Sequence, residues 1–211
     1  MKRLLRLSVL SFLLVLAACV QTRARPGKTV FETLQEKANA ASAAGGIAAV
    51  GIGEAESLNK ALDRAKNRAR AEIARMVEIK IDNLHKDFLA EIGEDEGSAF
   101  NALFTNACKL LISRILRSGV PRALKYEKKG ATAIGYALIV VDPKDIADAF
   151  AQHDETQRRL YTRFRASQAF EQLDKEIRKF SEYKRRTGLV RPAPSHKSPR
   201  IPPSHEVQPG G

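Results

Sequence analysis

Cysteine and tryptophan are almost missing from this 211-residue sequence, which contains two of the first and none of the second. The only possible partner for Cys108 is Cys19, which closes an N-terminal leader-like segment. An internal disulfide framework is therefore excluded, and with it the class of small domains held together by disulfides. Cys108 stands in an apolar helical context, which predicts a small buried residue. An intermolecular disulfide or a reactive thiol is the alternative.

Motifs of catalysis and metal binding are missing as well. No two of the four histidines have the spacing of a metal site or a catalytic pair; they are His85, His153, His196 and His205. Neither a serine nucleophile elbow nor a Cys-His signature occurs. Gly51-Ile52-Gly53 matches only half of a dinucleotide fingerprint, because Glu56 stands at the place of the third glycine. We therefore expect no enzyme, no cofactor and no metal.

Only one long apolar run is present, and it lies at the N-terminus. Residues 1–6 contain three basic side chains, residues 7–16 are almost wholly apolar, and Ala17-Ala18 precede Cys19. This is the order of regions in a secretory signal. The apolar part is shorter than the ~20 residues that a membrane-spanning helix needs. An ordinary signal peptide or an uncleaved anchor is one interpretation.

Leu16-Ala17-Ala18-Cys19 also resembles the bacterial lipoprotein signal, in which the cysteine receives a lipid before cleavage. The resemblance implies that residues 1–18 are a lipoprotein signal peptide and that Cys19 carries covalent diacylglyceryl and N-acyl groups. Two or more acyl chains hold a protein stably at a membrane. Val20 differs from the aspartate of an inner-membrane retention signal, which implies an anchor in the outer membrane, facing the periplasm.

The positive charge of the chain lies outside its middle part. The net charge is +12, yet residues 45–154 contain sixteen basic and sixteen acidic residues. The excess belongs to the leader, to residues 19–44 and to residues 155–211. A neutral domain without aromatic residues among its cations differs from a nucleic-acid groove, so no nucleic-acid partner is expected.

Residues 45–154 predict one domain in which strands and helices are mixed. Glycine-closed or alternating apolar runs predict strands, and apolar residues three and four apart predict helices. The expected strands are 46–53, 120–127 and 131–141, and the expected helices are 58–88 and 98–117. The strand over 131–141 is apolar on both faces, so we expect it in the centre of the sheet, and Gly130 supplies a hairpin turn before it.

The flanking segments differ from this domain in composition. Residues 19–44 predict a lipidated N-terminus and spacer, with a weak helix over 30–41. Asp142-Pro143 is typical of a helix start, and the helix is expected to run to about residue 186, with a bend or a separate helix near Ser167 as an alternative. Residues 188–211 contain six prolines and predict a disordered tail.

The basic amphipathic stretch over 155–187 is expected either to pack on the domain or to associate with a second copy. Its cations are candidate anion-binding residues: Arg158, Arg159, Arg163, Arg165, Arg178, Lys179, Lys184, Arg185 and Arg186. Near an anionic lipid surface each such charge contributes about 1 kcal/mol. Lipid phosphates and peptidoglycan carboxylates are the candidate anions. A charged face that only keeps the helix soluble is the alternative.

Three features of residues 45–150 occur together: the strand Val50-Gly51-Ile52-Gly53, the strand Tyr136 to Val141 with Asp142, and a helix with spaced alanines. That helix has Ala61, Ala65 and Ala69, followed by Arg70, Glu72, Ile73 and Ala74. In these features the sequence resembles the bacterial twenty-kilodalton lipoprotein family, which includes flagellar-associated lipoproteins. The resemblance implies an α+β fold, with long helices packed on a small antiparallel sheet of about three strands.

The sequence as a whole indicates an exported, lipid-anchored envelope protein with a non-enzymatic assembly or scaffold role. Its expected partners are a membrane, through the lipid, and either a second copy or other envelope proteins. An association with the flagellum is what the resemblance adds. The alternative is a tethered binding module that holds peptidoglycan or anionic lipid with its basic helix.

Overall fold

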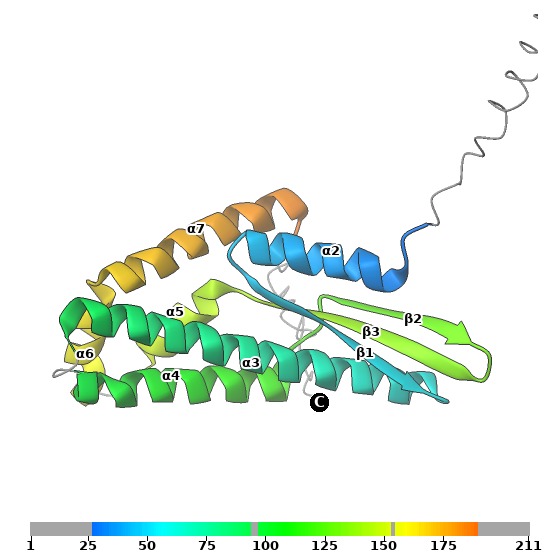
Figure 1. The fold of residues 1–211 in the computed structure, drawn as a ribbon, viewed down its shortest axis with the longest axis horizontal. Coiled ribbons are helices and arrows are strands. Elements are labelled where there is room, and N and C mark those ends of the chain that lie inside the picture. The colour runs from blue at the N-terminus through cyan, green and yellow to red at the C-terminus, as the bar shows by residue number, and fades with distance from the viewer. Residues whose placement is uncertain (1–26, 94–96, 153–154, 190–211) are drawn as a thin grey trace, which may run out of the picture.

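The computed structural model describes residues 27–93, 97–152 and 155–189. Within these ranges the chain forms an antiparallel sheet with helices on both faces (Figure 1). The fold is therefore the expected α+β arrangement of long helices on a small antiparallel sheet.

The sheet consists of β1 (Ile47–Ala55), β2 (Ala123–Lys129) and β3 (Thr132–Val141). The strand order is β1-β3-β2, so the run that is apolar on both faces occupies the centre, as predicted. Most of β3 is buried, because helices cover both of its faces. Gly130 has φ +61° and makes the turn between β2 and β3 without the steric cost that a side chain would bring there.

Helix α3 (Leu58–Ile92) lies directly on β1 and β3. A Cβ atom on Gly51 would come within 2.1 Å of the Ala65 carbonyl oxygen, and one on Gly53 within 2.3 Å of the Ala61 oxygen. The glycines of β1 and the alanines of α3 therefore let the two backbones approach each other closely. This contact confirms that Gly51 and Gly53 have a structural role.

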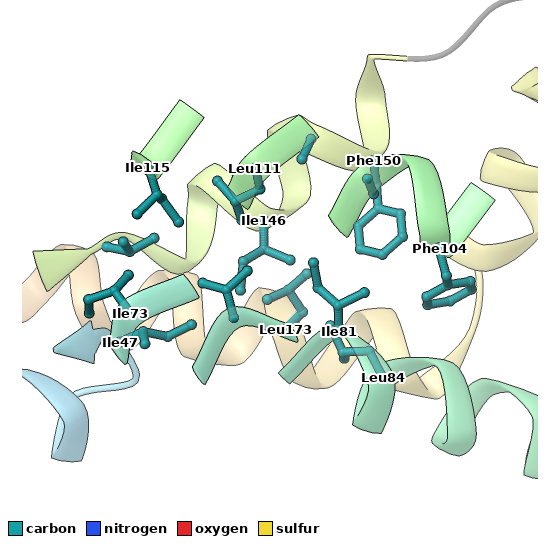
Figure 2. Packing of buried hydrophobic residues seen from close by; sticks show 14 of the residues in the cluster. Ile47, Ile73, Ile81, Leu84, Phe104, Leu111, Ile115, Ile146, Phe150 and Leu173 are labelled. Carbon is teal, nitrogen blue, oxygen red and sulfur yellow. The ribbon is translucent and has the colours of Figure 1, made fainter. Parts of the chain in front are cut away.

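The main apolar cluster fills the space between α3 and four other helices. Helix α4 (Gly97–Ser118) runs beside α3, and Figure 2 shows side chains from the helices meeting in the core. The phenylalanines form its centre, with ring centroids of Phe88 and Phe100 4.8 Å apart and those of Phe104 and Phe150 5.0 Å apart. The paired apolar stripes predicted for these two long helices thus share one core.

The described chain between β3 and residue 189 forms three helices, so the prediction of one helix from 143 to about 186 was wrong. They are α5 (Pro143–Ala151), α6 (Glu155–Arg165) and α7 (Gln168–Thr187). Asp142 caps α5 as predicted, since its Oδ1 accepts a hydrogen bond from the Lys144 amide. Ser167 ends the α6 segment and caps α7, which matches the alternative of a separate helix at this residue.

Helices α6 and α7 pack on the rest of the fold. Phe164, Phe170 and Leu173 belong to the main apolar cluster, and an ion pair joins Lys80 of α3 to Glu176 of α7 at 2.6 Å. Of the two alternatives for the basic stretch, packing on the domain is therefore the arrangement observed.

The opposite face of the sheet carries a second, smaller apolar cluster. Helix α2 (Val30–Ala43) places Leu34, Ala38 and Ala41 there, and Phe180 of α7 joins them. Thr29 begins α2 with a capping box, in which its hydroxyl accepts from the Glu32 amide and the Glu32 carboxylate accepts from the Thr29 amide. The segment expected as a spacer with a weak helix thus contains a packed helix.

Candidate functional site

The nine predicted anion-binding residues lie on two helices at different places in the fold. Arg158, Arg159, Arg163 and Arg165 are on α6; Arg178, Lys179, Lys184, Arg185 and Arg186 are on α7. All of them except Lys184 are exposed. Figure 1 shows α6 at one end of the molecule and the C-terminal end of α7 near α2. The cations therefore form two groups and not one convergent site.

Several of these cations make contacts within the fold. Lys184 is half-buried and forms an ion pair with Asp142. Arg163 places its guanidinium carbon 5.8 Å from the centre of the Phe100 ring, and a Nη atom of Arg186 lies 3.4 Å from a Glu182 oxygen. The contacts of Lys184 and Arg163 join α7 and α6 to the rest of the fold, whereas the Arg186–Glu182 pair lies within α7, and a ligand anion would have to compete with all three.

A cleft of about 660 Å³ adjoins the C-terminal group of cations. Lys184 and Arg185 line it together with Arg122, which precedes β2, and the carboxylates Asp142 and Asp145. Burial raises the pKa of the Asp145 carboxyl, and the nearby charge of Asp142 raises it further. The cleft is thus of mixed charge. Sequence reasoning missed Arg122, because only the antiparallel pairing of β2 with β3 brings it to α7.

A groove of about 650 Å³ runs between α3 and α4, and its lining surface is mainly apolar although more than half of its lining residues are polar or charged. Its polar members include Asp82 and His85 of α3 and Cys108 of α4. The His85 ring stacks on Phe104 with centroids 4.4 Å apart. His85 Nε2 is buried and has no hydrogen-bond partner among the described residues.

Within this groove, His85 and Cys108 favour their neutral forms, although charged side chains also line it. Desolvation lowers the pKa of His85, and Asp82 offsets part of the effect. Burial raises the pKa of the Cys108 thiol, and the negative charges of Glu78 and Asp82 raise it further. A thiol with a raised pKa is a poor nucleophile, because the thiolate is the reactive form. The groove is suited to an apolar ligand more than to acid–base or nucleophilic chemistry.

Some predicted features fall outside the described residues. These are the leader, Cys19, His153, and the proline-rich tail from residue 190. Among the residues described, no three His, Cys, Asp or Glu side chains form a group able to hold a metal ion. Within the same ranges, no helix has both the length and the apolar character needed to cross a membrane.

Comparison of the chain with protein-family models, with curated proteins and with solved structures gave no match.

Proposed function

We propose that this chain is an exported envelope protein, anchored by a lipid on Cys19 in the outer membrane, with a non-enzymatic role in assembly within the periplasm. The sequence around Cys19 supports the anchor. Seven residues lie between Cys19 and Gly27, where the described chain begins, and even when fully extended the eight steps from Cys19 to Gly27 span at most about 29 Å. The folded part is therefore held close to the lipid surface, where flagellar and other envelope structures are candidate partners.

One structural observation supports the assembly role more than any other. Most of the exposed large apolar residues gather between the end of α4 and β2, an edge strand of the sheet. They are Leu116, Val120, Leu124 and Tyr126, with 44% to 63% of their surface exposed. These residues are close in the sequence, and exposed apolar patches mark interaction sites in proteins.

The anchor is tested by Cys19→Ser in the full chain, followed by separation of membrane and soluble fractions. We expect the wild-type protein to remain with membranes at high salt, because its acyl chains are buried in lipid. We expect the variant to be in the soluble fraction or unprocessed, since it lacks the acceptor thiol. Mass spectrometry of the wild-type N-terminal peptide should show the acyl groups on Cys19. A variant that stays fully processed and membrane-bound at every salt concentration would overturn the anchor.

The runner-up function is a tethered module that binds envelope anions. The observation in its favour is the cleft in which Arg122, Lys184 and Arg185 meet. The anion-binding function predicts a different result when membrane and soluble fractions of the Cys19→Ser chain are separated. The Cys19→Ser chain should then sediment with envelope material at low salt and be released at high salt, because attraction between exposed charges is screened.

A further inference from the structure

β2 is a free edge of the sheet in the part of the chain described. It pairs with β3 on one side only, and no other described strand pairs with it. The other edge strand, β1, is mostly buried, and its Ile52 carbonyl oxygen accepts a hydrogen bond from Arg68 of α3. An edge strand presents alternate unpaired N–H and C=O groups, which are a template for pairing with another strand.

The side chains of β2 separate into two faces. Leu124 and Tyr126 stand opposite Ala137 and Gly135 of β3, which both face α3. They are nevertheless 44% and 53% exposed, because the helix does not reach over this strand. Lys125 and Glu127 point to the α2 side of the sheet. The Glu127 carboxylate is held there by the hydroxyl of Tyr136 on β3, which donates to its Oε2 atom at 2.7 Å.

We propose that β2 pairs in antiparallel fashion with β2 of a second copy, with Tyr126 on the two-fold axis. The proposal rests on the assembly role and names its partner as an identical chain. The two three-stranded sheets would join into one continuous sheet. Tyr126 then packs against Tyr126 of the second copy, and Lys125 lies opposite Glu127 of the second copy, twice over.

Tyr126 is the middle residue of β2, so an axis there pairs the whole strand, and charge opposes the registers on either side of it. In a continuous antiparallel sheet, opposite residues share a face, so the axis must pass through a residue of β2. An axis at Lys125 would oppose two lysines, and an axis at Glu127 would oppose two glutamates. Like charges directly opposite each other are unfavourable. With the axis at Tyr126, Lys128 and Lys129 meet only uncharged residues, Leu124 and Ala123.

The same symmetry is compatible with two anchors in one membrane. A two-fold axis perpendicular to the sheet leaves both copies of α2 on the same side of the joined sheet. Both chains would therefore enter the fold, at Gly27, on one side of the dimer. Confinement of both copies to a membrane raises their effective concentration, which allows a short strand contact to form.

The test is disulfide cross-linking of the full-length, membrane-bound chain in a Cys108→Ser background. Tyr126→Cys should give a covalent dimer on mild oxidation, because residues directly opposite each other lie about 4.5–5.5 Å apart at Cα, within disulfide range. Leu124→Cys and Lys128→Cys should each fail alone, since each would lie about 13 Å from its own copy. Expressed together, these two variants should cross-link, and this combination retains Tyr126. The Cys108→Ser chain alone measures the background from Cys19.

A charge exchange tests the register independently. Lys125→Glu should lower the yield of the Tyr126→Cys dimer several-fold, and adding Glu127→Lys should restore it. Tyr136→Phe is the matched control for the lost hydrogen bond of Glu127 and should leave the yield unchanged. Absence of a dimer from both Tyr126→Cys and the mixed pair, in protein with wild-type helix content, would overturn the proposal. Equal cross-linking at residues 124, 126 and 128 would do so too. Neither result would bear on the anchor, which the fractionation of Cys19→Ser tests separately.

Discussion

At the scale of the single residue, His85 has the most unusual environment. Its ring stacks on Phe104 of the neighbouring helix, and its buried Nε2 atom makes no hydrogen bond to a described residue. An imidazolium in this position would lose solvation, so the neutral form is favoured and the pKa is lowered. The residue behaves as an aromatic packing group that happens to be titratable.

This environment makes the stability of the protein depend on pH. The unfolded chain has an imidazole pKa of about 6.5 and takes up a proton more readily than the folded chain. Stability should therefore fall as the pH decreases through 6.5 towards the lower folded pKa, and change no further below it. His85→Phe retains the stack and removes the titration. Its melting temperature should fall less than that of the wild type between pH 7.5 and 5.5.

The difference is measurable by thermal denaturation, because about 1 kcal/mol shifts the melting temperature by roughly 2–4 °C in a chain of this size. Asp82, Glu78 and Cys108 line the same groove and remain in both proteins, so the comparison isolates the imidazole. An identical pH dependence in the two proteins would show that His85 is solvated when folded.

The sequence alone predicted part of this residue-scale picture. Apolar spacing placed Cys108 on a packed helix face, although the structure leaves it half-buried at the groove. The stack of His85 on Phe104 was not predictable, because the two residues belong to different helices and lie nineteen positions apart in the sequence. Their contact depends on how far α4 is shifted along its axis relative to α3, which the spacing of residues within either helix does not determine.

At the scale of the element, two serines occupy the N-cap positions of helices but make different contacts. Ser167 is buried at the start of α7, and its hydroxyl accepts from the Phe170 amide at 3.2 Å. A Glu91 carboxylate oxygen accepts from the Gln168 amide at 2.9 Å, which satisfies another free N–H of the first turn. Ser57 begins α3, but its side chain makes no capping hydrogen bond.

These two caps form a matched pair of substitutions. Ser167→Ala should destabilise the protein by about 1–2 kcal/mol, because it leaves a buried amide of α7 without its acceptor. Ser57→Ala should change stability by less than about 0.5 kcal/mol, as is usual for exposed positions. Chemical denaturation of both variants measures the difference. Equal losses would show that the hydroxyl of Ser167 does not support α7.

Helices and strands with a regular apolar spacing in the sequence were predicted well, whereas the segment after Asp142, where that spacing shifts, was not. The helix expected over 98–117 spans Gly97–Ser118, and the central strand expected over 131–141 spans Thr132–Val141. The long helix expected after Asp142 is divided, because the capping hydroxyl of Ser167 offers the backbone an alternative to continued helix. The shift of apolar phase near this serine was the available signal.

At the scale of the whole molecule, α6 and α7 belong to the same core as the long helices. The Phe164 ring lies 4.7 to 5.4 Å from the rings of Phe88, Phe104, Phe150 and Phe170, measured between centroids. The division at residue 154 that composition and charge predicted therefore does not separate two packing units. Charge differs on the two sides of this boundary, whereas the buried faces are continuous.

The shared core predicts one cooperative unfolding transition. Phe164→Ala should destabilise the entire fold by about 3–5 kcal/mol, because it leaves a cavity among packed rings. Helix and sheet signals should be lost together in denaturant, with coincident midpoints. Phe31→Ala is the matched control on α2, where the ring is 37% exposed, and it should cost about 1 kcal/mol or less. Loss of the α6 and α7 signals before the rest would contradict a single core.

The division of the apolar interior into two clusters also has a mechanical meaning for a chain tethered at Cys19, as we propose. Tension transmitted along the chain enters the described fold at Gly27 and reaches α2 first. This helix contributes side chains only to the smaller cluster, on the side of the sheet away from α3 and α4. Peeling α2 away would lengthen the tether while the larger cluster stays packed. The first helix is thus placed to yield under load before the rest of the fold.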